Sequence, residues 1–191
     1  MADDNRLLRN SGGYRKLKSF QIAQLIYDIT VRFVELYVDK RSRTCDQMVQ
    51  AARSGVQNIA EGSVASATSK KTELKLTNVA RASLEELLLD YEDFLRQRGM
   101  PLPSPDSSVV LSIRRARLDN MADFRHFLSD LSVWAEVSLP QSGKVAITAI
   151  TLINQSQMLL GKQLERLAED FAMEGGFTER LYQVRSKTRR G

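Results

Sequence analysis

Few side chains in this sequence could act as catalysts, and they are scattered. His126 is the only histidine, so histidine-based metal sites and most histidine-dependent dyads lack partners. Cys45 begins a predicted helix, where a thiolate is favoured, but no second cysteine accompanies it. Glu85 and Glu86 are adjacent, so a helix points them to different sides, and no Glu-x-x-His pair is present for a di-metal site. We therefore predict a protein that is not an enzyme and needs no cofactor or metal.

Basic side chains offer a different chemistry, the binding of phosphate groups. The 191-residue chain has a formal net charge of +5 and an isoelectric point of about 9.5. This mild excess is compatible with RNA, with DNA or with an acidic protein. No base-reading motif accompanies it, so the alternative is that the charges are only solvated. The predicted nucleic-acid-binding residues form four groups: Lys40, Arg41 and Arg43; Lys70, Lys71 and Lys75; Arg114, Arg115 and Arg117; and Arg185, Lys187, Arg189 and Arg190.

The composition indicates an ordinary globular chain with one domain. It is 42% hydrophobic and 27% charged, with 10 glycines and 4 prolines. No run approaches the roughly 18–20 apolar residues that cross a membrane, and the first residues lack the apolar segment of a secretory signal. The single cysteine excludes an internal disulfide. We expect a protein of the bacterial cytoplasm without a membrane partner.

Four long helices are expected to position the basic groups. Apolar residues three and four apart predict them over residues 14–38, 45–61, 70–98 and 143–174. The first helix has two apolar stripes, where a bundle helix needs one. The second stripe favours contact with a neighbouring subunit, and a deeply buried central helix is the alternative. One stripe is Phe20, Ala23, Tyr27, Thr30, Val34 and Tyr37, and the other is Ile22, Ile26, Ile29, Phe33 and Leu36.

The third and fourth predicted helices each carry one inward seam. Ser69 is the expected N-cap of the third helix, and Gly99 ends it. Asn154 and Gln157 interrupt the apolar stretch of the fourth helix, and we expect them to be buried amides that fix register. The seams are Thr77, Ala80, Leu84, Leu87, Tyr91 and Phe94, then Ala146, Ile150, Ile153, Gln157, Leu160, Leu164, Leu167 and Phe171.

Two flanking segments and an insertion complete the predicted organisation. Residues 1–13 are expected to be a mobile arm before the core domain of residues 14–174, and residues 175–191 a basic tail. An insertion at about 106–140 lies between the third and fourth helices. We expect it to form two docked helices, 109–118 and 121–137, with an inward face of Phe124, Phe127, Leu128, Leu131 and Trp134.

Small residues gather in the stretch Ser54-Gly-Val-Gln-Asn-Ile-Ala-Glu-Gly62, which closes the second predicted helix. They let other helices approach closely, and Gly62 is predicted to end the helix in a left-handed conformation. Asn58 lies beside the apolar face and must be hydrogen-bonded if it is buried. We therefore assign a structural motif to Ser54, Asn58, Ile59, Glu61 and Gly62.

This motif resembles the signature of the four helix bundle protein family. That family groups the proteins encoded in intervening sequences of bacterial ribosomal RNA genes with the accessory variability determinant, Avd, of diversity-generating retroelements. The third helix is also similar, because its Ala-x-x-Ser-Leu-x-Glu-Leu pattern falls on Ala80, Ser83, Leu84, Glu86 and Leu87. The resemblance covers residues 14–98 and 143–174. The insertion is a departure from the compact members of the family.

The resemblance implies an all-α protein, an antiparallel up-down-up-down four-helix bundle that assembles as a homopentamer. In such a bundle the first and third basic groups share one end, and the lysine group lies at the other. Avd binds its reverse transcriptase and nucleic acid, so we expect an accessory protein that binds RNA or DNA through phosphates, with a reverse transcriptase as a partner. The alternative is a structural or protein-binding scaffold oligomer without a nucleic-acid role.

Overall fold

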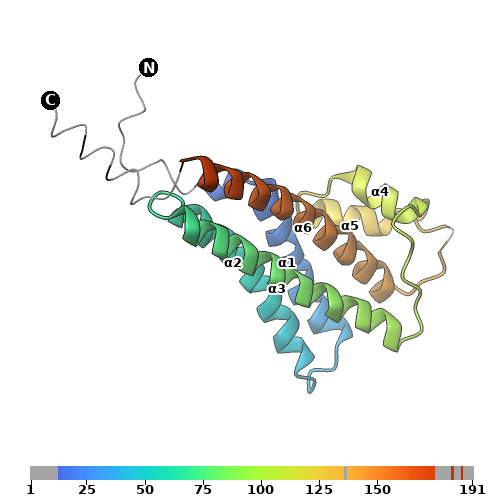
Figure 1. Cartoon of the computed structure of the whole chain (residues 1–191). Helices are drawn as coiled ribbons and strands as arrows, with labels where there is room; N and C mark the ends of the chain where they lie inside the picture. Colours follow the sequence, from blue (N-terminus) through green and yellow to red (C-terminus); the bar gives the residue numbers. More distant parts are fainter. Residues whose placement is uncertain (1–12, 136, 175–181, 183–185, 187–191) are drawn as a thin grey trace.

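The computed structural model describes residues 13–135, 137–174, 182 and 186 (Figure 1). These residues form helices and no strand, which confirms the all-α class. The predicted arm of residues 1–12 and nearly all of the predicted tail lie outside the described residues. The elements are the 3₁₀ helix η1 (Gly13–Lys16) and the α-helices α1 (Lys18–Tyr37), α2 (Thr44–Ala65), α3 (Lys70–Gln97), α4 (Ser108–Ala116), α5 (Met121–Ser129) and α6 (Gln141–Glu174).

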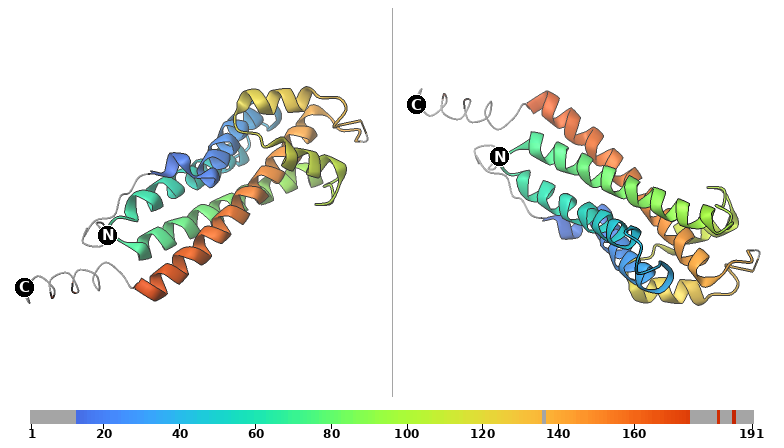
Figure 2. Two further views of the ribbon diagram at one scale, coloured as in Figure 1. Left: turned by 90° about the horizontal axis from the view of Figure 1, so that it is seen from above. Right: turned by 90° about the horizontal axis from the view of Figure 1, so that it is seen from below.

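The four long helices supply the main packing contacts. Helix α2 packs against α3, α3 against α6, α6 against α1, and α1 against α2, so each long helix has two long neighbours. The short helices cover one side of this set, with α4 on α6 and α5 on α1. Figure 2 shows the same arrangement from above and from below.

Helix α1 is buried along both of its apolar stripes by the rest of this chain. The buried members are Phe20, Ala23, Thr30 and Val34 of one stripe and Ile22, Ile26, Ile29 and Phe33 of the other. Tyr27 and Tyr37 are half-buried, and Leu36 has 62% of its surface exposed. The two stripes therefore need no subunit neighbour, and the alternative of a buried central helix describes α1 better.

Helices α2 and α3 approach closely where the two family-like motifs lie. A Cβ atom added to Gly55 would come within 2.9 Å of Leu84 Cδ2, so a larger residue would force the buried Leu84 side chain to shift. Gly62 faces Leu76 and Thr77 at ordinary van der Waals distance. The prediction that Gly62 ends α2 is wrong, because the helix continues to Ala65. Gly62 lies within α2 on the side that faces α3, and it does not adopt a left-handed conformation.

The ends of helix α3 follow the predicted signals. The Ser69 hydroxyl accepts a hydrogen bond from the backbone N–H of Thr72, as an N-cap does. At the other end Gly99 has a φ of 65°, a left-handed conformation that glycine adopts without strain. Near that end Phe33 packs against both Tyr91 and Phe94, with ring centroids 4.8 and 4.7 Å apart. This aromatic cluster fixes α3 against α1.

The segment between α3 and α6 contains the two short helices α4 and α5, which contact α6 and α1, and α5 ends eight residues before the predicted end at residue 137. Phe124, Phe127 and Leu128 of α5 are buried, and so is Trp134 just beyond it. The Phe127 and Trp134 rings meet edge to face with centroids 6.1 Å apart. Leu131 was predicted to face inward but is 78% exposed, because α5 ends at Ser129 and the helical spacing no longer applies.

Helix α6 is buried over its first half and becomes exposed toward its end. Leu160 is fully buried, Leu164 and Leu167 are half-buried, and Phe171 is 37% exposed. The prediction of a buried Asn154 is wrong, because its side chain is exposed. Gln157 is half-buried, and its Nε2 donates to Glu85 Oε2 at 2.7 Å. None of the helices in the described residues could span a membrane.

Candidate nucleic-acid interface

The first predicted basic group lies in the connection between α1 and α2. Lys40, Arg41 and Arg43 are all exposed. The backbone N–H of Arg41 donates to Asp39 Oδ1 at 2.9 Å, which shapes the connection as a tight turn. Among the described side chains, none forms an ion pair with these three cations. They are therefore free to meet an external anion.

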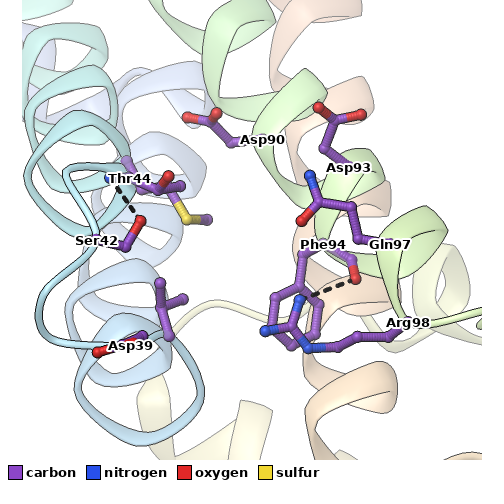
Figure 3. Close-up of a pocket in the computed structure, with 10 residues that line it drawn as sticks. Asp39, Ser42, Thr44, Asp90, Asp93, Phe94, Gln97 and Arg98 are labelled. Atoms are coloured by element: carbon purple, nitrogen blue, oxygen red, sulfur yellow. Dashed lines mark hydrogen bonds between the residues drawn. The ribbon is translucent and has the colours of Figure 1, made fainter.

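An acidic cavity lies next to this group, a feature that the sequence did not reveal. The cavity of about 190 Å³ is bounded by the α1–α2 connection on one side and by the end of α3 on the other (Figure 3). Asp39, Asp90 and Asp93 line it, together with Arg98. The Arg98 guanidinium stacks on the Phe94 ring, 3.7 Å from the centroid. None of the three exposed cations of the α1–α2 connection lines this cavity.

Asp90 is the electrostatically unusual group of the cavity. Its Oδ2 atom is buried and has no hydrogen-bond partner. Burial raises the pKa of the Asp90 carboxyl, and the nearby carboxylates of Glu86 and Asp93 raise it further. Charge on Asp90 is therefore disfavoured in the folded protein.

The second predicted group divides into one buried and two exposed lysines. Lys70 is only 3% exposed, and its Nζ donates to the backbone carbonyl oxygen of Asp170 at 3.3 Å. Its prediction as a nucleic-acid contact is wrong, because the second half of α6 covers the first turn of α3. Lys71 and Lys75 are exposed at the start of α3, far along that helix from Arg98. They remain candidates.

The third predicted group lies on α4 and just after it. Arg114, Arg115 and Arg117 are exposed, and Arg117 ends the helix with a φ of 47°. Arg114 lines a cavity of about 170 Å³ together with Glu92 of α3 and Asn154 of α6. This group therefore lies at the level of the last turns of α3, on a different side of that helix from Lys40. Arg185, Lys187, Arg189 and Arg190 of the fourth group lie outside the described residues.

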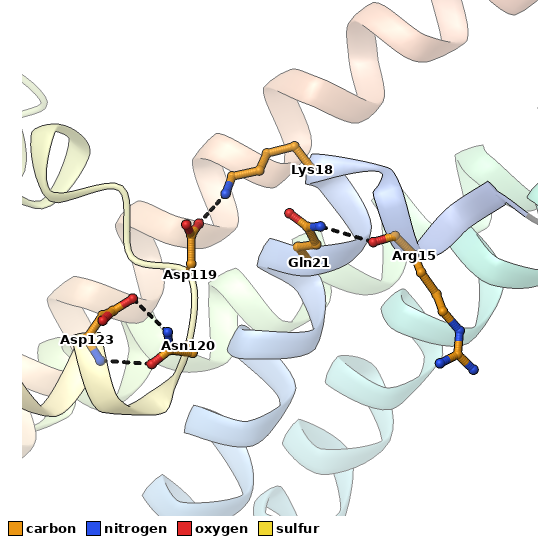
Figure 4. Close-up of polar contacts among 6 residues, drawn as sticks. All are labelled: Arg15, Lys18, Gln21, Asp119, Asn120 and Asp123. Carbon is orange, nitrogen blue, oxygen red and sulfur yellow. Dashed lines mark hydrogen bonds and ion pairs between the residues drawn. The ribbon is translucent and has the colours of Figure 1, made fainter.

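An ion pair near the third group was also missing from the sequence prediction. Lys18 Nζ contacts Asp119 Oδ1 and so joins the start of α1 to the α4–α5 connection (Figure 4). Asn120 then caps α5, because its Oδ1 accepts from the backbone N–H groups of Ala122 and Asp123. An Asn-x-x-Asp spacing before an apolar run is the sequence signal that could have revealed this cap.

The residues of the structural motif connect α2 to α3. Asn58 Nδ2 donates to the backbone oxygen and the hydroxyl of Ser54, at 2.9 and 3.1 Å. The Ser54 hydroxyl lies 2.9 Å from that of Ser83, so each family-like motif supplies one side of the contact. Ile59 is buried and Glu61 is exposed. The motif thus has a packing role between two helices.

The side chains considered for catalysis do not form a reactive cluster within the described residues. Cys45 is half-buried, and its Sγ lies 3.3 Å from the backbone oxygen of Asp39. His126 is exposed on α5. Within the described ranges, no three His, Cys, Asp or Glu side chains lie close enough together to hold a metal ion.

Comparison of the chain with models of protein families, with curated proteins and with solved structures finds no match. The family resemblance therefore depends on the two motifs alone. The contact between Ser54 and Ser83 gives those motifs a common structural role, but it does not identify the family.

Proposed function

We propose that this protein is a non-enzymatic accessory protein whose exposed cations bind the phosphates of RNA or DNA. One observation carries the proposal. Of the predicted basic residues that the structure describes, all except Lys70 are exposed, and none of the exposed ones forms an ion pair with a described carboxylate. Lys18, Arg32 and Arg96 are neutralised by neighbours. Cations without such neighbours retain their full attraction for a polyanion.

The fold that we propose for this function is an antiparallel up-down-up-down four-helix bundle, with α4 and α5 as the insertion. The cyclic contacts of α1, α2, α3 and α6 support it. We also propose a homopentamer, which rests on the family resemblance. Exposed apolar side chains such as Leu89 and Met158 offer surface for subunit contacts. A ring would repeat each basic group five times, so that weak phosphate contacts add.

The proposal is tested by the salt dependence of RNA binding. Fluorescence anisotropy of a labelled single-stranded RNA is measured between about 50 and 200 mM salt with the full chain. Affinity should fall with salt, and sequence should matter little. The triple substitution Lys40→Gln, Arg41→Gln and Arg43→Gln should lower the logarithmic salt slope by about 2, at about 0.7 for each lost phosphate contact.

A matched control uses cations that already have partners. Arg32→Gln and Arg96→Gln remove two positive charges that Glu35 and Asp93 neutralise in the free protein. This pair should leave the salt slope unchanged. If the control lost slope in proportion to its two removed charges, about two thirds of the loss in the triple variant, net charge alone would explain the effect. The absence of binding at low salt would overturn the proposal. In that second case the scaffold function, without nucleic acid, is the one to pursue.

A further inference from the structure

A groove lies beside the second half of α6, beyond the point where α1 begins. Helix α1 begins beside the middle of α6, where the Ser156 hydroxyl donates to the backbone oxygen of Ser19 at 3.4 Å. Before α1, the short helix η1 packs on α2 and α1. At about 1.5 Å per residue, α6 continues for more than 20 Å beyond Ser156. The resulting cavity has a volume of about 540 Å³.

The lining of this groove includes three leucines among polar and charged residues. Leu159 and Leu167 of α6 line it, and so does Leu17, directly before α1. All three are only half-buried. In the first half of α6, the neighbouring α1 completes the burial of the same helix. The groove could therefore hold one more helical segment against α6.

Two of the three cations that line the groove have no ion-pair partner in the described chain. Lys162 and Arg166 are one turn apart on α6, both are exposed, and neither forms an ion pair there. The start of α1 is a further positive feature, because its N-cap is Leu17, no side chain caps it, and its first turn has no acidic residue. Lys18 is already neutralised by Asp119.

Two carboxylates also line the groove, and their position limits what can bind. Asp170 lies beside Lys70, whose ammonium group donates to its backbone oxygen. Glu73 lines the groove from α3. These two come from the part of the groove near the start of α3, whereas Lys162 and the start of α1 lie nearer its other end. An occupant should carry its acidic residues toward the α1 end.

We propose that this groove binds an acidic amphipathic helix of a partner protein. Its apolar side packs on Leu159 and Leu167, and its carboxylates face Lys162, Arg166 and the N-terminus of α1. A nucleic acid fits less well, because a phosphate backbone offers no apolar stripe for the leucines. The site is separate from the phosphate proposal, since none of its lining residues belongs to the predicted basic groups.

The test uses labelled synthetic helical peptides and the full chain. Three peptides of about 14 residues are compared: one has leucines at helical spacing and flanking glutamates, one has lysines in place of the glutamates, and one is a scrambled acidic sequence. Fluorescence anisotropy should show that the acidic helix binds at least about 10-fold more tightly than the other two. The double reversal Lys162→Glu and Arg166→Glu should weaken the acidic peptide and strengthen the basic one.

The control reverses two exposed arginines outside the groove, Arg53→Glu and Arg81→Glu, which leaves the net charge equal to that of the groove variant. Peptide binding to this control should match the wild type. The proposal is overturned if the scrambled peptide binds as well, if both double variants behave alike, or if no peptide binds. It is also overturned if light scattering shows an oligomer that is lost in the groove variant and kept in the control, because the groove then binds a second copy of this chain.

Discussion

Thr30 and Tyr91 form the main polar contact inside the core, and both are fully buried. The Thr30 hydroxyl donates to the backbone oxygen of Ile26 at 2.7 Å, so the Tyr91 hydroxyl, 3.0 Å away, is the donor between the two side chains. Burial raises the pKa of Tyr91, so its hydroxyl keeps the proton that it donates. This contact ties α1 to α3 at one defined register.

We predict that Thr30→Val destabilises the protein by about 1–3 kcal/mol, because the buried Tyr91 hydroxyl loses its partner. The double variant Thr30→Val with Tyr91→Phe should cost less than the sum of the single variants, since both polar groups are then removed. Urea unfolding of the four proteins gives the coupling energy. Additive effects would show that the two hydroxyls do not depend on each other.

Gly55 of α2 lies directly against the Leu84 side chain of α3. Gly55→Val should destabilise the protein by about 1–3 kcal/mol, because the new side chain overlaps the buried Leu84. Gly161→Val is the matched control, since a Cβ at that position on α6 meets nothing within 4 Å. Thermal unfolding should show a clear loss only for the first variant. Similar losses in both would mean that helix propensity, rather than the α2–α3 contact, sets the effect.

Asp90 should make the stability depend on pH in the opposite direction from a typical surface carboxyl. The folded chain holds its proton more tightly than the unfolded chain does, so stability falls as pH rises above about 4. Asp90→Asn should therefore stabilise the protein at neutral pH, and the gain should disappear toward pH 3.

Asp130 provides the comparison for that titration. Hydrogen bonds from the Ser132 hydroxyl and backbone lower the pKa of Asp130, so its contribution is present at neutral pH and is lost as the solution becomes acidic. Asp130→Asn should thus reduce stability at neutral pH and match the wild type at low pH. Parallel pH profiles for the two variants would contradict the assignment of Asp90.

Among the elements, the α4–α5 insertion is held mainly by apolar packing. Trp134 and Phe127 are buried, whereas the Lys18–Asp119 ion pair is exposed. Trp134→Ala should cost about 3–5 kcal/mol locally and remove hydrogen-exchange protection from α4 and α5, while α2 and α3 remain protected. Lys18→Ala should change stability by at most about 1 kcal/mol. Uniform loss of protection in the Trp134 variant would show that the insertion is not a separate unit.

Helix positions were predictable from apolar spacing, and the errors have local causes. The N-cap at Ser69 and the stop at Gly99 depend on neighbouring residues only, so the sequence reveals them. Gly62 was misread because a glycine within a helix and one that ends a helix look alike in sequence. Asn154 was expected to be buried because the spacing of apolar residues in α6 does not show which side of the helix stays exposed to solvent.

For the molecule as a whole, the exposed cations were predicted more easily than their surroundings. Charge and spacing identified Lys40, Arg41 and Arg43, which the structure leaves exposed. The acidic cavity beside them brings together residues from α3 and the α1–α2 connection, which are distant in sequence. Lys70 was wrongly assigned to the interface because the residue that covers it, Asp170, is 100 residues away in the sequence.

Mass in solution, measured by light scattering with and without a short structured RNA, tests the phosphate-binding proposal most directly. At about 50 mM salt the protein should form a pentamer that gains the mass of bound RNA, and at about 200 mM salt much of that RNA should be released. A pentamer that ignores RNA at low salt would contradict phosphate binding. A monomer would contradict the multivalent mechanism.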